Sequence, residues 1–212
     1  PKTTSRLLSL KAAGNSLATE NLMAFWLAPE EKSGEMPAKN KTRLSAHGLR
    51  KRVTIGLPGL PHAIEYKVTF AVPAGEGHRR GVFEAVTGYM PAEFSKFWKF
   101  DPNSAKFEPL DDGPGEQSLP VALATPDGKF AMGVYSPAQP SRGFESAGYG
   151  RFRFPAEKVV KWNCVFREEN PRGLAAKDYE YLCYVAVGTL EDVRRTLEAL
   201  SKRPAKRKNE ER

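Results

Sequence analysis

The segment from Ile64 to Val72 constrains the fold of this 212-residue chain more than any other. Its apolar and polar side chains alternate strictly, with Ile64, Tyr66, Val68, Phe70 and Val72 set against Glu65, Lys67 and Thr69. Successive side chains of a strand point to opposite faces, so this pattern predicts a strand with one buried and one wet face.

Further segments show strand patterns and are separated by turn residues. Strands are predicted over residues 5–10, 22–27, 49–55, 81–87, 119–125, 130–135, 150–154, 159–167 and 179–187. Strands and helices do not alternate along the chain, which argues against a parallel α/β fold. The sequence therefore predicts an all-β, mainly antiparallel fold, a large β-sandwich with few short helices and one C-terminal helix.

Two helices are expected. Pro91 suits a first helical position, and aromatic residues at helical spacing follow it, so a short helix is predicted over residues 90–98. The stronger prediction is a C-terminal helix over residues 189–202, where Thr189 is a cap and Asp192 follows three residues later. Pro204 then ends that helix.

We expect one domain over residues 1–203 and a disordered, dispensable basic tail over residues 204–212. A hydrophobic fraction of 40% can fill a sizeable core, and no apolar run is long enough to span a bilayer. The chain starts at Pro1 and not at Met, so we expect either a processed protein or a piece of a longer one. Compartment and oligomeric state are left open.

The formal net charge of +8 suggests a nucleic-acid partner, but its distribution argues against one. From Lys202 onward, six Lys and Arg against two Glu give +4, so the rest of the chain carries only +4 from 27 basic and 23 acidic residues. A basic end is usually solvated, and nucleic-acid binding is therefore not the preferred interpretation.

No metal or cofactor is expected. The three histidines, His47, His62 and His78, are widely separated in the sequence. Asp111, Asp112 and Glu116 offer oxygen ligands for calcium, but adjacent acids are more often turn residues. Cys164 and Cys183 lie in apolar strands as buried thiols or as a bridge.

The loop over residues 111–120 is the most promising place for a site. Its glycines and prolines exclude a helix, and polar side chains on a loop between rigid strands often form sites. Together with other polar and aromatic residues it suggests a sugar site, because rings cover the apolar faces of a sugar while polar groups bind its hydroxyls. The candidate binding residues are Arg80, Glu84, Gln117, Tyr149, Arg151, Arg153, Trp162 and Asn163. The arginines would favour an acidic saccharide.

Several phrases resemble an uncharacterised group of bacterial proteins that is associated with the galactose-mutarotase-like β-sandwich superfamily. They are residues 23–27, 51–56, 87–91, 113–117, 149–154 and 161–167. The superfamily includes aldose epimerases, domains of lyases and glycosidases, and non-catalytic sugar binders. Mutarotases carry a base in a Glu-x-Gln-x-x-Pro phrase, which Glu116-Gln117-Ser118-Leu119-Pro120 resembles without the intervening residue.

The resemblance implies a carbohydrate-directed protein. Because proteins of this superfamily are generally longer, it also implies that the chain lacks N-terminal strands of a longer parent. Together with the charge of the tail, these observations leave three hypotheses about function. The first is an epimerase-like or related enzyme in which Glu116 is the base and His78 the acid. The second is a non-catalytic carbohydrate-binding module. The third is a basic nucleic-acid-binding protein that uses its tail.

Overall fold

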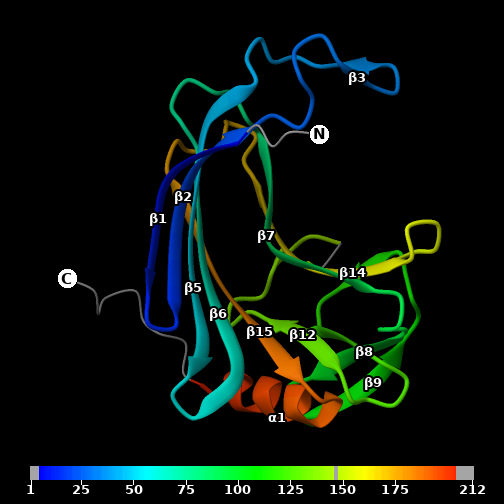
Figure 1. Ribbon diagram of the computed structural model, residues 1–212. Helices are drawn as coiled ribbons and strands as arrows, with labels where there is room; N and C mark the ends of the chain where they lie inside the picture. Colours follow the sequence, from blue (N-terminus) through cyan, green and yellow to red (C-terminus); the bar gives the residue numbers. More distant parts are fainter. Residues whose placement is uncertain (1–4, 146–147, 204–212) are drawn as a thin grey trace.

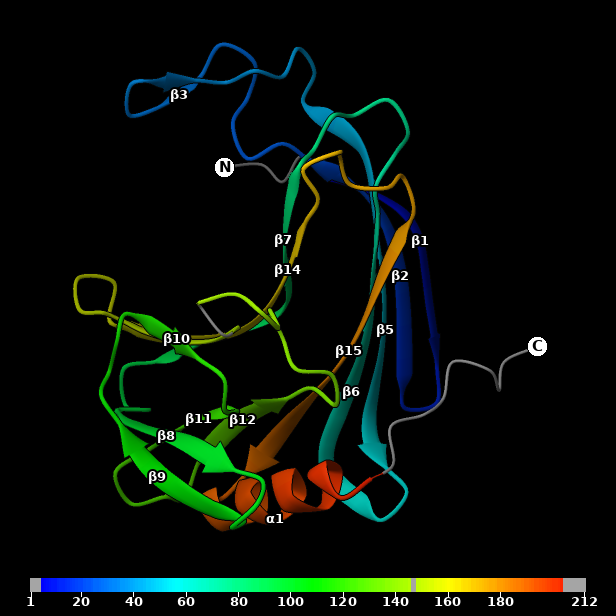
Figure 2. The same ribbon diagram turned by 180° about the vertical axis from the view of Figure 1, so that it is seen from behind.

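The computed structural model describes residues 5–145 and 148–203 and confirms the predicted all-β, mainly antiparallel sandwich. A nine-stranded sheet runs along one side of a four-stranded sheet and continues beneath it, and a small hairpin extends from the top (Figures 1 and 2). The strands of the nine-stranded sheet, in spatial order, are β1 (Arg6–Ala13), β2 (Ser16–Ala24), β5 (Leu44–Leu57), β6 (Leu60–Ala71), β15 (Asp178–Gly188), β12 (Ala131–Tyr135), β11 (Val121–Ala124), β8 (Lys96–Asp101) and β9 (Lys106–Leu110). The smaller sheet has the order β10 (Gly115–Gln117), β13 (Tyr149–Phe154), β14 (Val159–Glu169) and β7 (Arg80–Pro91). The hairpin is β3 (Lys32–Ser33) with β4 (Met36–Pro37).

The strand predicted from the Ile64 pattern is β6, which lies inside the nine-stranded sheet. It pairs antiparallel with β5 on one side and with β15 on the other. Its apolar face includes Val68, which is 1% exposed, and Phe70, which contacts the ring of Phe83 in the smaller sheet. The alternation therefore marks the face on which the two sheets meet.

The main core fills the space between the sheets. Trp162 of β14 is 1% exposed and lies at its centre. A Cβ at Gly88, which pairs with Trp162 across the sheet, would lie 2.4 Å from its indole ring. Only glycine therefore leaves room for this side chain. Cys164 and Cys183 are buried free thiols in the same core, with sulfur atoms 3.8 Å apart.

The C-terminal helix is α1 (Leu190–Ser201), which confirms the prediction for this segment. The Thr189 hydroxyl accepts a hydrogen bond from the Asp192 backbone, and the Asp192 carboxylate accepts one from the Thr189 backbone, forming a capping box. A second core, which includes Val193 and Leu197, lies between this helix and the nine-stranded sheet. The helix thus covers the sheet face that is turned away from the main core.

Two local predictions are wrong. No helix forms over residues 90–98, because β7 ends at Pro91 and β8 begins at Lys96. Phe97 packs in the main core while Trp98 packs against the second core, which is the alternation of a strand. The apolar run 22–27 is not a buried strand throughout, since β2 ends at Ala24 and Trp26 is 85% exposed.

Two further predictions concern the ends of the chain and membranes. The predicted basic tail, residues 204–212, lies outside the described residues. Within residues 5–145 and 148–203, no helix has the length and apolar character needed to cross a membrane.

Candidate functional site

A cleft of about 330 Å³ opens where the nine-stranded sheet and β7 diverge. The ends of β2, β5 and β6 form one wall, and the start of β7 forms the other. Much of its lining is apolar, namely Met23, Ala24, Phe25, Trp26, Phe70, Ala71, Val72, Val82, Phe83 and Leu174. The polar side chains that line it include those of Ser45, His47, His78 and Arg80. A largely apolar cleft with few polar groups is the usual form of a ligand site.

His47 enters this cleft because of its position along β5. Leu49 pairs with Phe70 of β6, so the side chain two residues earlier shares the face that meets the core. The Ser45 hydroxyl accepts a hydrogen bond from the His47 backbone at 3.2 Å and donates one to the Met23 carbonyl at 2.8 Å. An imidazole thus continues an apolar face at the point where the sheets separate.

The other members of the group come from the loop between β6 and β7, which contains Glu76 and His78. The His78 carbonyl accepts a backbone hydrogen bond from Leu174 at 2.7 Å, and the neighbouring Arg79 carbonyl accepts one from Asn170 at 3.0 Å. These two bonds fasten the chain around His78 to the loop that follows β14.

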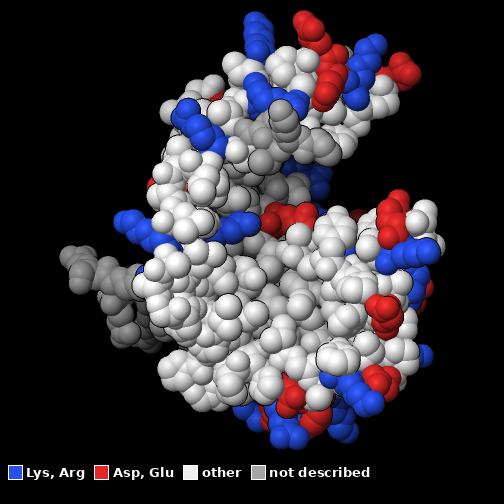
Figure 3. Space-filling model, viewed as in Figure 1, with Lys and Arg blue, Asp and Glu red and all other residues white. Residues whose placement is uncertain are grey.

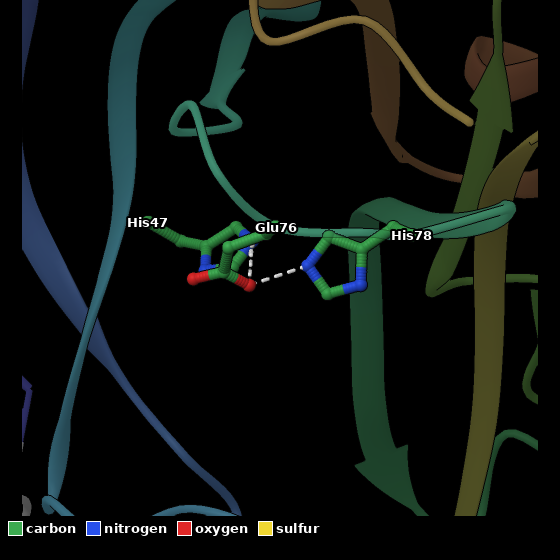
Figure 4. A group of neighbouring side chains, drawn as sticks. All are labelled: His47, Glu76 and His78. Atoms are coloured by element: carbon green, nitrogen blue, oxygen red, sulfur yellow. Dashed lines mark hydrogen bonds and ion pairs between the residues drawn. The ribbon is translucent and has the colours of Figure 1, made fainter.

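His47, Glu76 and His78 converge at the edge of the cleft (Figure 4). The Glu76 carboxylate Oε2 lies 2.6 Å from His78 Nε2 and 3.7 Å from His47 Nε2. The two imidazole rings are 5.3 Å apart and tilted by 51°. The side chains are 22% (His47), 31% (Glu76) and 42% (His78) exposed, so solutes can reach them. A carboxylate between two imidazoles can hold sugar hydroxyls, move protons or bind a metal ion.

Trp26 and Arg80 complete the cleft. Trp26 lines it and is nevertheless 85% exposed, so its ring is open to a ligand. The chain beyond Trp26 is fixed by Asn40, whose amide donates to the carbonyls of Leu27 at 3.0 Å and Thr42 at 2.9 Å. Arg80 forms a loose ion pair with Glu169 at 3.6 Å, and both side chains are more than half exposed.

On one face, the molecule is deeply notched between its upper and lower parts (Figure 3). Basic and acidic side chains are mixed around this notch, and acidic atoms lie at its base (Figure 3). The face in that view therefore shows no continuous basic stripe of the kind that binds nucleic acid.

Glu116, the predicted base, is held by an arginine that the sequence analysis did not single out. Its carboxylate accepts from both terminal nitrogens of Arg167, at 2.7 and 2.8 Å, and from the Gly148 backbone at 3.2 Å. The two side chains are only 15% (Glu116) and 11% (Arg167) exposed. The hydrogen bond to Glu116 raises the pKa of the Arg167 guanidinium. The predicted base and acid therefore have different partners: Glu116 binds Arg167, and His78 binds Glu76.

Glu84 and Asn163 are brought together on the smaller sheet. Glu84 Oε1 lies 2.8 Å from Lys161 Nζ and accepts from Asn163 Nδ2 at 3.4 Å. Desolvation raises the pKa of Glu84, but its bonds to Lys161, Thr87 and Asn163 outweigh this and lower the pKa below its ordinary value. This group belongs to the four-stranded sheet and is not part of the cleft lining.

The remaining predicted residues hold the loop over residues 111–120 or fill the core. Arg151 and Arg153 bind Asp111 and Asp112, each at 2.5 Å. The Gln117 amide donates to the Leu119 carbonyl at 3.1 Å. The Tyr149 hydroxyl accepts from the buried Ser136 backbone at 2.8 Å, and Tyr149, like Trp162, is almost fully buried.

Sequence reasoning identified only His78 and Arg80 among the polar residues of the cleft. A signal for His47 is present in the sequence, because this residue extends the apolar face of the strand predicted over residues 49–55. Glu76 gives no signal, since a lone acid in a Gly-rich turn is ordinary. Trp26 falls in a run predicted to be buried, and its exposure follows from the end of β2 at Ala24.

Comparisons with known proteins give a likeness of fold. The alpha-galactosidase from Lactobacillus brevis has a TM-score of 0.48 and 14% identity, over 88% of this chain and 26% of that one. The GH36 alpha-galactosidase AgaB from Geobacillus stearothermophilus has a TM-score of 0.46 and 10% identity, over 90% of this chain and 28% of that one. YeaD from Salmonella typhimurium, provisionally assigned as a mutarotase, has a TM-score of 0.33 and 12% identity, over 87% of this chain and 65% of that one.

These neighbours are related to carbohydrates by name. This chain spans about a quarter of the length of the two galactosidases and less than two thirds of YeaD. A scan against protein-family models and a search of curated protein sequences find no match. Since the three proteins named here are at most 14% identical to this chain and their TM-scores are below 0.5, no site residue is carried over from them.

Proposed function

We propose that this protein binds a saccharide in the cleft between the nine-stranded sheet and β7. The observation that carries the proposal is an exposed indole, Trp26, in the same cleft as the imidazoles of His47 and His78. An aromatic ring covers the apolar face of a sugar, while imidazole, carboxylate and guanidinium groups bind its hydroxyls. The volume of about 330 Å³ lies at the small end of ligand sites, which favours a short saccharide or one end of a chain.

Arg80 favours an acidic saccharide over a neutral one. Its partner Glu169 lies 3.6 Å away, and both side chains are exposed, so this ion pair is weak. A carboxylate on a sugar would offer the guanidinium two oxygens in a planar fork, which gives stronger hydrogen bonds than sugar hydroxyls do.

The test is calorimetric titration of the whole chain with neutral and acidic mono- and disaccharides. Trp26→Ala should weaken binding by about fivefold or more, taking as a guide the roughly 1–3 kcal/mol that stacking of a nucleobase on an aromatic side chain contributes. Phe130→Ala is the matched control, since Phe130 is 65% exposed but does not line the cleft. Absence of binding to every saccharide, or equal binding by Trp26→Ala, would contradict the proposal.

A second candidate is sugar isomerisation, favoured by the pairing of Glu76 with His78 at 2.6 Å. Opening or epimerising a sugar needs a base and an acid, and a carboxylate beside an imidazole supplies both. Glu116 stays a prediction as an alternative base. Polarimetry of a fresh aldose solution would report turnover, and Glu76→Gln and Glu116→Gln would show which carboxylate is required.

A further inference from the structure

We propose that His47, Glu76 and His78 form a site for a divalent transition metal ion, with Zn²⁺ as its best representative. Two imidazoles and one carboxylate are the ligand set of many zinc sites that keep one position open. Imidazole nitrogen suits zinc, copper, iron and nickel, whereas calcium and magnesium prefer oxygen. The residue types therefore select a transition metal.

The geometry of the group needs only side-chain adjustment to hold such an ion. Ligand atoms around a tetrahedral zinc ion lie about 3.3 Å apart, given bonds of about 2.0–2.1 Å. The Glu76 carboxylate lies 2.6 Å from one imidazole nitrogen and 3.7 Å from the other, so the two separations bracket this value. The ligand atoms of all three residues lie within 4.8 Å of one another.

The backbone holds the histidines from two different directions. His47 lies on β5, and Ser45 fixes its backbone. His78 is tied through its carbonyl to Leu174. The carboxylate of Glu76, from the same loop as His78, lies between the two imidazole rings. The carboxylate of Glu76 and the two imidazoles would bind the ion through atoms that carry no proton, because metal ligands bind in their deprotonated forms.

Histidine beside a carboxylate is not enough for such a site. His62 lies 3.9 Å from Asp192, and its other ring nitrogen is 3.0 Å from the Val187 carbonyl. Among the described residues, only the group at the cleft brings three potential ligands within reach of one ion. His62 therefore provides a matched control on the same molecule.

The open position would be accessible from the cleft, since His47 and His78 both line it. A water molecule would fill this position in the free protein. If the saccharide proposal holds, a sugar oxygen would replace that water, so the metal ion and the sugar would bind next to each other. Metal binding itself does not depend on this step.

The experiment is calorimetric titration of tag-free, chelator-treated whole chain with zinc chloride, because a polyhistidine tag would bind the ion itself. We expect one equivalent to bind, with the Kd raised more than about tenfold in His47→Ala and in His78→Ala. His62→Ala should bind as the parent does. Circular dichroism and thermal melts without metal establish that each variant is folded.

Failure of the parent to bind zinc would overturn the metal site, and so would unchanged affinity in both His47→Ala and His78→Ala. Loss of binding in His62→Ala would also overturn it. Saccharide titrations with and without zinc keep the two proposals separate. Trp26→Ala should bind zinc like the parent, because it changes only the proposed sugar platform.

Discussion

At the scale of single residues, the pair formed by Glu116 and Arg167 has the clearest energetic consequence. Both side chains are largely removed from water, and the guanidinium binds the carboxylate through two nitrogens. A buried ion pair adds little to the stability of a protein compared with two apolar residues in the same place. Removing one partner of such a pair is nevertheless costly, because the other charge stays buried. Glu116 is therefore important for stability, whatever it does in function.

We expect Glu116→Gln to lower the free energy of unfolding by about 3 kcal/mol, because the buried Arg167 guanidinium loses the carboxylate that binds it through two nitrogens. Urea denaturation measures the change. Asp178→Asn is the matched control, since Asp178 binds Arg50 and both side chains are more than 40% exposed. That exposed pair should contribute less than about 1 kcal/mol.

A double variant, Glu116→Leu with Arg167→Met, tests whether the loss of stability comes from the charge that a single substitution leaves buried. Removing both charges should recover most of the stability lost in Glu116→Gln. If the single variant costs no more than the Asp178 control, or if the double variant is the least stable, the pair is not acting as a buried ion pair.

At the scale of elements, α1 depends on its cap. Thr189 and Asp192 satisfy each other's backbone groups at the start of the helix, and Val193 begins its buried face. Thr189→Ala should cost about 1 kcal/mol of unfolding free energy in urea, whereas Thr189→Ser should cost much less because it keeps the hydroxyl. Equal losses in the two variants would show that the methyl group, not the cap, matters.

The same cap predicts a dependence on pH. The Thr189 hydroxyl bond, aided by the backbone bond, lowers the pKa of Asp192 in the folded protein. Its contribution is fully present above the ordinary aspartate pKa and is lost as the pH falls through the lowered value. The stability difference between the parent and Thr189→Ala should therefore shrink in acid. Denaturation series at neutral and strongly acidic pH measure it, and a constant difference would contradict this account.

At the scale of the whole molecule, stability should decrease from the centre of the nine-stranded sheet to its edge. β15 lies between β6 and β12 and contains buried residues, whereas nearly every side chain of edge strand β1 is exposed. We expect hydrogen exchange to be slowest in β15 and fastest in β1, since an exposed edge strand can open while the core stays packed. Equal protection of β1 and β15 against hydrogen exchange would contradict this gradient.

The sequence by itself determined the fold class, most of the strands and the C-terminal helix. These depend on local rules, because alternation such as that from Ile64 to Val72 and a cap such as Thr189 act over a few residues. The same rules were wrong over residues 90–98, where aromatic residues at helical spacing pack on opposite faces of β8. Spacing alone cannot distinguish a short helix from a strand that is buried on both faces.

Only the tertiary structure decided which polar residues meet. It brought His47 on β5 to Glu76 and His78 on a later loop, although nearly thirty positions separate His47 from Glu76 in the sequence. It also paired Glu116 with Arg167, which lies 51 positions further along the chain. Such pairings are set by strand order, and strand order depends on how the apolar faces of the whole chain are buried together. For that reason the sequence predicted which types of residue could bind a sugar, and the fold decided which of them lie in the same cleft.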